Sequence, residues 1–117
     1  MVALEGVEIV KAFIEKQKQM DAVFFTTNYL GTMGLQAIKD LKLRIPEDIA
    51  VISFDDNEIF SLYPPGITTI QQPTYDIAKS AIDILMAQIS TRKLDTSKLD
   101  LKIPSMLIER GSTISKI

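Results

Sequence analysis

Apolar positions along the chain follow two different periods, and the change from one to the other predicts the secondary structure. From residue 3 to 18 they recur every three or four residues, which predicts a helix with one buried face. The run 22–25 is apolar throughout and is typical of a short strand buried on both faces. Helical spacing returns at 30–41, and the apolar run 49–54 predicts a second buried strand. The first half is therefore predicted to be α-β-α-β.

The second half of the chain carries stronger breaks. Pro64-Pro65-Gly66 ends a short helix, and Pro73 opens the longest one. We expect a short helix over 57–63, a strand over 67–70, a helix over 73–90, and two short strands at 101–103 and 106–108. Parallel strands are joined through a helix with a right-handed crossover. The predicted fold class is therefore α/β, an open parallel sheet with flanking helices.

Polar residues follow each of the first two predicted strands. Asn28 lies just past the first strand and Asp55 just past the second, so in a parallel sheet both belong to one rim. Ligands of open α/β sheets bind beyond the carboxyl ends of the strands. The pair Asp55-Asp56 at that place therefore indicates a site for a polar ligand.

The same side chains have structural interpretations. Asn28 suits a helix N-cap, and capping and ligand contact can both hold. Asp55 and Asp56 could cap the helix that follows them, since acidic groups favour a helix N-terminus. A metal-dependent enzyme is a third interpretation of the two carboxylates. However, no third acid sits in that loop and no base or nucleophile constellation accompanies it. We expect no catalytic residue, no metal and no cofactor.

Composition narrows the function classes. The chain has 117 residues, which suits one small domain. A net charge of −2 and a pI near 5.1 argue against this chain itself holding a nucleic-acid backbone. It has no Cys and no His, so a disulfide framework and the commonest metal ligand are excluded. No apolar run approaches the roughly 20 residues of a membrane span. Glu5 and Glu8 interrupt any signal-peptide core at the start.

A set of motifs, each weak alone, becomes specific through its order and spacing. They are Thr27-Asn28, Gly34, Arg44 to Ile49, Phe54-Asp55-Asp56, Pro64-Pro65, Thr68-Thr69-Ile70, Gln72-Pro73 and Ile108 to Thr113. Together they resemble the C-terminal part of the lactose-repressor/galactose-repressor family, from about Leu4 to Thr113. That family consists of bacterial transcription regulators. The resemblance implies a partial lobe of the periplasmic-binding-protein-like (type I) fold.

The resemblance also implies site residues. Asn28, Asp55 and Gln72 match family positions that contact or border a small-molecule effector. Tyr29 stands where the family often has Asp, and a tyrosine can stack on a sugar ring or a base or cover the cleft. Two family helices usually form a dimer interface, and the matching apolar residues are Met33, Leu35, Ile59, Phe60, Leu62 and Tyr63.

The resemblance further implies how the chain fits a larger protein. About 1–72 and 105–117 would form the C-terminal lobe, and about 73–104 would return to a first lobe that is missing here. We therefore expect a fragment: the effector-binding and dimerisation portion of a cytoplasmic regulator, forming a homodimer and sensing a small molecule such as a sugar. It would reach operator DNA only through a head absent from this chain, and would not contact a membrane. A fragment of a periplasmic sugar-binding transport protein is the alternative.

Overall fold

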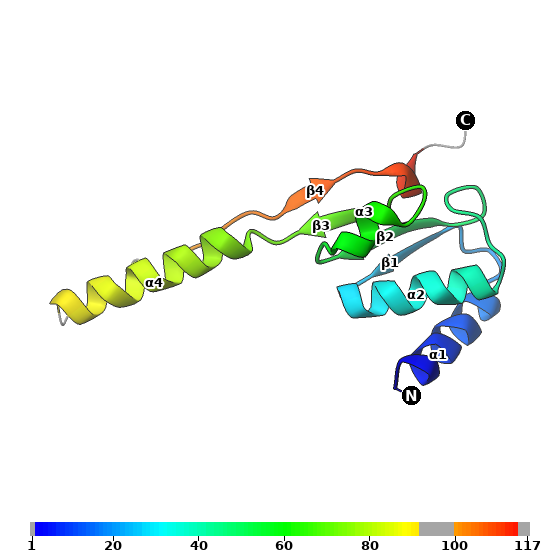
Figure 1. Cartoon of the computed structure of the whole chain (residues 1–117), viewed down its shortest axis with the longest axis horizontal. Coiled ribbons are helices and arrows are strands. Elements are labelled where there is room, and N and C mark those ends of the chain that lie inside the picture. Colours follow the sequence, from blue (N-terminus) through cyan, green and yellow to red (C-terminus); the bar gives the residue numbers. More distant parts are fainter. Residues whose placement is uncertain (1, 92–99, 115–117) are drawn as a thin grey trace. The chain divides into compact units, whose positions relative to one another are not determined.

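The computed structural model describes residues 2–91 and 100–114. Its elements in chain order are α1 (Val2–Lys16), β1 (Ala22–Phe25), α2 (Asn28–Asp40), β2 (Ala50–Phe54), α3 (Glu58–Leu62), β3 (Thr68–Gln71), α4 (Thr74–Thr91), β4 (Met106–Ile108) and the 3-10 helix η2 (Gly111–Thr113) (Figure 1). The predicted elements are confirmed with small shifts of their ends. The exception is 101–103, where the structure has no strand.

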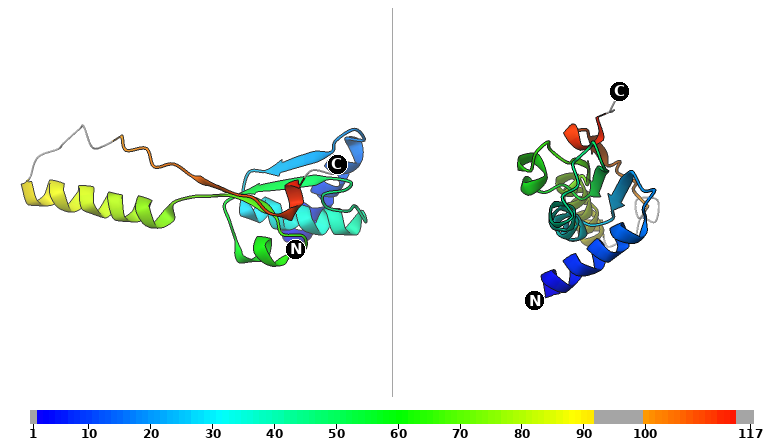
Figure 2. Two further views of the ribbon diagram at one scale, coloured as in Figure 1. Left: turned by 90° about the horizontal axis from the view of Figure 1, so that it is seen from above. Right: turned by 90° about the vertical axis from the view of Figure 1, so that its right-hand side faces the viewer.

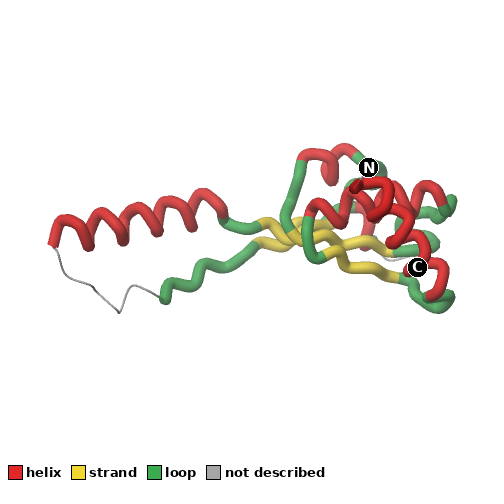
Figure 3. Tube along the Cα trace, turned by 90° about the horizontal axis from the view of Figure 1, so that it is seen from below, coloured by secondary structure: helices red, strands yellow, loops and turns green. Residues whose placement is uncertain are grey.

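The strands form one sheet in the order β1-β2-β3-β4. Figure 3 draws the strands in yellow. β1, β2 and β3 are parallel, with Phe25 beside Ser53 and Phe54 beside Ile70. The predicted open α/β sheet is thus confirmed. β4 makes it mixed, because the chain leaves β3 into α4 and returns as β4 in the opposite direction (Figure 1). The carboxyl ends of the three parallel strands share one rim.

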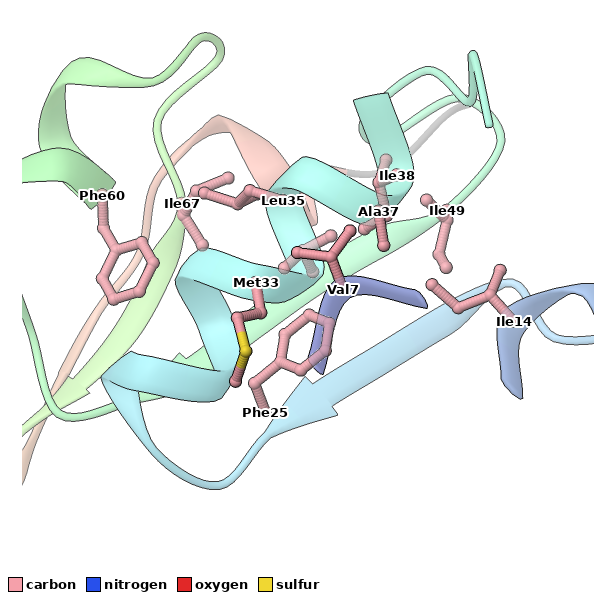
Figure 4. Packing of buried hydrophobic residues seen from close by; sticks show 11 residues of the cluster. Val7, Ile14, Phe25, Met33, Leu35, Ala37, Ile38, Ile49, Phe60 and Ile67 are labelled. Carbon is pink, nitrogen blue, oxygen red and sulfur yellow. The ribbon is translucent and has the colours of Figure 1, made fainter. Parts of the chain in front are cut away.

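α1 and α2 pack on the same side of the sheet (Figure 2). Strand side chains alternate, so Phe25 and Val51 point into the core between sheet and helices, while Phe24 on the other face keeps 49% of its surface exposed. Figure 4 shows the buried apolar cluster. Its members are Val7, Ile14, Phe25, Met33, Leu35, Ala37, Ile38, Ile49, Val51, Phe60 and Ile67.

α2 approaches β1 closely because Gly34 has no side chain. The neighbour that comes close to this glycine is the ring of Phe25. A Cβ added to Gly34 would overlap that ring. Glycine has poor helix propensity, but at position 34 it leaves the space that the Phe25 ring fills between α2 and β1.

Replacing Gly34 by alanine is expected to lower the free energy of unfolding by about 1 to 3 kcal/mol, because overpacking outweighs the gain in helix propensity. Urea unfolding followed by circular dichroism measures the change. Lys39→Ala, at an exposed position of the same helix, should stay within about 0.5 kcal/mol of wild type. A stabilised Gly34→Ala chain would show that the Phe25 ring can move aside at little cost.

The chain divides into two compact units, residues 1–71 with 107–117 and residues 72–106. The second unit contains α4, which has no buried residue. Its large exposed apolar side chains are Tyr75, Ile77, Ile82, Leu85, Met86 and Ile89. α4 therefore presents an apolar surface without a core of its own to cover it. Among the described residues, no helix is long and apolar enough to cross a membrane.

Candidate functional site

The rim of the sheet carries polar residues from the loops after β1 and β2. Thr27 caps α2, since its Oγ1 accepts a hydrogen bond of 3.0 Å from the backbone N–H of Leu30. Asn28 is the first residue of that helix and is half-buried. The interpretation of Asn28 as the N-cap is therefore wrong, because the hydroxyl one residue earlier makes the capping bond. The Asn28 side chain is left for another role at the rim.

Asp55 directly follows β2 and has a left-handed backbone conformation, with φ of 77°. Aspartate and asparagine tolerate this conformation better than most residues other than glycine. The backbone N–H of Asp55 donates to the carbonyl oxygen of Ile70 at 2.8 Å, so the turn is tied to β3. Asp55 is half-buried at the rim. The parallel register places it on the same edge of the sheet as Asn28, as the sequence predicted.

Asp56 forms an ion pair with Arg110 from the far end of the chain. Arg110 Nη1 and Nη2 donate to the two carboxylate oxygens at 2.9 and 3.1 Å. Both side chains are largely buried, with 19% and 17% of their surfaces exposed. The hydrogen bonds from Arg110 hold the pKa of Asp56 below its ordinary value. The pair therefore stabilises the fold above the ordinary aspartate pKa, and this contribution is lost as the pH falls through the lowered value.

The ion pair corrects the expected role of Asp56. The N-cap residue of α3 is Asn57, and its side chain makes no capping hydrogen bond. Asp56 is engaged by Arg110 instead, so it is not the cap. Both of its oxygens bind a guanidinium, which also argues against a metal held between Asp55 and Asp56. In the part of the chain that the structure describes, no group of three His, Cys, Asp or Glu residues could hold a metal ion.

The remaining ligand candidates lie in different settings. Tyr29, in the first turn of α2, keeps 58% of its surface exposed, so its ring is available to a ligand. Gln72 directly follows β3 and is half-buried. It is the first residue of the second unit.

The residues expected to face a dimer partner separate into two groups. Phe60 has no exposed surface and Leu35 only 3%, and Met33 is also buried in the core. The expectation that Phe60 and Leu35 face a partner is wrong, because both are covered by the chain itself. Ile59 and Leu62 are exposed. Tyr63 is half-buried against the core.

A family model described as the periplasmic binding protein-like domain matches residues 3–113. The chain belongs to this family. The ribose operon repressor of Escherichia coli K12 is 34% identical over 92% of this chain and 32% of its own length. The dimeric Lac repressor with an 11-residue C-terminal deletion is similar at a TM-score of 0.80 and 26% identity, over 97% of this chain and 40% of that one. A LacI family transcriptional regulator from Arthrobacter sp. FB24, in complex with lactose, shares the fold at a TM-score of 0.83 and 23% identity, over 96% of this chain and 41% of that one.

These relatives confirm the resemblance to the lactose-repressor/galactose-repressor family and the partial periplasmic-binding-protein-like fold that it implied. Their names are those of repressors and regulators, which agrees with the expectation of a non-enzyme. The chain spans about a third of the length of the curated relatives that it matches.

Proposed function

We propose that this chain is the effector-binding and dimerisation portion of a bacterial DNA-binding transcription regulator. The observation that carries the proposal is the position of Asn28 and Asp55 on one rim of a parallel sheet, in a chain whose relatives include operon repressors. DNA contact would come from another part of the regulator, since this chain has a net charge of −2. A regulator acts where the bacterial chromosome lies, so the cytoplasm is the proposed compartment.

The rim residues suit a sugar-like effector. The carboxylate of Asp55 can accept hydrogen bonds from two hydroxyl groups, and the amide of Asn28 can both donate and accept. The exposed ring of Tyr29 offers an apolar face on which a sugar ring can stack. Gln72, just past β3, would add a further amide. A regulator of this fold solved in complex with lactose fits this effector class.

Asp55→Asn is expected to weaken sugar binding by the full-length gene product by about 10- to 100-fold, because hydrogen bonds to a charged group contribute about 1.5 to 3 kcal/mol. Calorimetric titration with ribose, lactose and cellobiose identifies the sugar that binds and measures its affinity. Asp21→Asn is the matched control, because Asp21 directly precedes β1 and lies at the opposite end of the sheet. Equal affinity of Asp55→Asn and wild type would remove Asp55 from the site.

Two exposed surfaces support a homodimer. Ile59 and Leu62 on α3 are exposed apolar residues. A groove of about 370 Å³ runs between α1 and α2, and its lining residues are Leu4, Val7, Glu8, Thr32, Met33, Gln36 and Asp40. Its apolar floor would suit a second copy of the chain. The Lac repressor, a relative of known structure, is described as dimeric.

The segment 73–104 would return to a first lobe of the full regulator. The bare apolar surface of α4 supports this, since patches of more than a few hundred Å² are seldom left uncovered. An effector between two lobes would favour one arrangement of them and so change the spacing of the DNA-binding heads by population shift. Relatives named as operon repressors favour this role over that of a periplasmic transport protein.

A further inference from the structure

Arg110 is fixed at both its backbone and its side chain. Its backbone N–H donates to Thr68 Oγ1 at 2.9 Å, and its carbonyl oxygen accepts from the same hydroxyl at 3.1 Å. Its guanidinium holds both oxygens of Asp56, and Nη1 also donates to the carbonyl oxygen of Ile67 at 2.9 Å. The start of β3 therefore sets the place of Arg110, and Arg110 in turn sets the place of Asp56.

Asp56 directly follows Asp55, the central residue of the proposed effector site. Asp55 has a positive φ, a conformation that costs free energy for a residue with a side chain and persists only when its surroundings hold it. Its own N–H is held by Ile70 on one side. On the other side, the fork from Arg110 holds Asp56. The turn is thus held at two successive residues, Asp55 by Ile70 of β3 and Asp56 by Arg110.

We propose that Arg110 is a positioning residue for the effector site, which fixes Asp56 and through it the direction of the Asp55 carboxylate. That a ligand binds at Asp55 rests on the proposed function, whereas the effect of Arg110 on the geometry of the turn does not. Arg110 belongs to the first unit, in the stretch that begins at Leu107 after the second unit ends at Met106. The chain that comes back from the second unit is thereby tied to the loop that carries Asp55.

A second arginine–aspartate fork in the chain supplies a matched control. Arg44 Nε and Nη2 donate to Asp48 at 3.0 and 3.1 Å. This pair precedes β2, whereas Asp55 and Asp56 follow it, and the Arg44 side chain is 71% exposed. Arg44→Lys and Arg110→Lys make the same chemical change, a loss of the planar fork with the charge kept. Only Arg110→Lys should affect the site.

The first measurement is a double-mutant cycle on the full-length gene product, titrated with ribose, lactose and cellobiose. Arg110→Lys is expected to weaken binding of the sugar that the wild type takes at least tenfold, and Asp56→Asn to act in the same direction. Arg44→Lys should leave the affinity unchanged. In an Asp55→Asn background, Arg110→Lys should add little, because it acts through Asp55. Purely additive losses of affinity, or no loss, would overturn the proposal.

The second measurement needs no ligand and separates this inference from the proposed function. In ¹H–¹⁵N spectra of the 117-residue chain, Arg110→Lys should move the amide resonance of Asp55 and change its HN–Hα coupling, while Arg44→Lys should not. If no sugar binds the wild type, the effector class fails and this spectrum decides the positioning role. An unmoved Asp55 resonance in folded Arg110→Lys and Asp56→Asn chains would refute it.

Discussion

Replacing Phe60 by alanine is expected to lower the free energy of unfolding by about 3 to 5 kcal/mol. The side chain has no exposed surface, and it is the only buried residue of α3. Its ring packs beside the first turn of α2, where a Cβ added to Gly31 would lie 2.8 Å from Phe60 Cζ. Truncation therefore opens a cavity and removes the anchor that attaches α3 to the core. Urea unfolding followed by circular dichroism measures the loss.

Leu62→Ala is the matched control on the same five-residue helix. Leu62 keeps 68% of its surface exposed, so stability should change by less than about 0.5 kcal/mol. If α3 belongs to a dimer interface as proposed, the same substitution should lower the fraction of dimer in sedimentation of the full-length gene product. A loss of less than about 1 kcal/mol for Phe60→Ala would contradict this packing of the ring. Unchanged association of Leu62→Ala would count against a dimer through α3.

The secondary structure was predictable because its signals are local. Continuous apolar runs mark β1 and β2, and helical spacing marks α1, α2 and α4. The parallel pairing of β1 and β2 follows from the helix between them. The prediction of a strand at 101–103 was wrong, because a short apolar stretch does not by itself provide a neighbouring strand to pair with.

The side on which α3 packs could not be predicted. The apolar residues in and directly after α3 are Ile59, Phe60, Leu62 and Tyr63. A helix of five residues is too short for periodicity to define a face. Tertiary packing against Gly31 decides that Phe60 turns inward. The resemblance assigned the whole helix to an interface. It did not distinguish the exposed side chains of Ile59 and Leu62 from the buried side chain of Phe60.

The candidate site was predictable only in part. Asn28 and Asp55 could be assigned to one rim because each directly follows a strand of a parallel pair. The partner of Asp56 could not be found in this way, since Arg110 lies 54 residues further along the chain. No spacing rule connects residues so far apart. Only the fold brings Arg110, the N-cap residue of η2, to the loop after β2.

Ser112→Ala is the second substitution with a large expected effect, a loss of about 2 to 6 kcal/mol, because two buried backbone groups lose a partner and each costs about 1 to 3 kcal/mol. The serine is fully buried. Its hydroxyl donates to the carbonyl oxygen of Val51 and accepts from the backbone N–H of Thr68 at 2.8 Å. One side chain from η2 thus bridges β2 and β3. Urea unfolding measures the stability, and hydrogen exchange of the Thr68 amide reports the bond itself.

Ser61→Ala provides the comparison, because that hydroxyl also donates to a backbone carbonyl, that of Glu58 at 2.7 Å, but on an exposed helix. Water can replace the lost bond there, so the change should stay within about 0.5 kcal/mol. At Ser112 the site is buried, so water cannot replace the hydrogen bonds that Ser112→Ala removes. The substitution should therefore lower the free energy of unfolding and also make the Thr68 amide exchange faster. If Ser112→Ala matches Ser61→Ala in stability and leaves Thr68 protected, β2 and β3 hold each other without the bridge, and η2 merely rests against them.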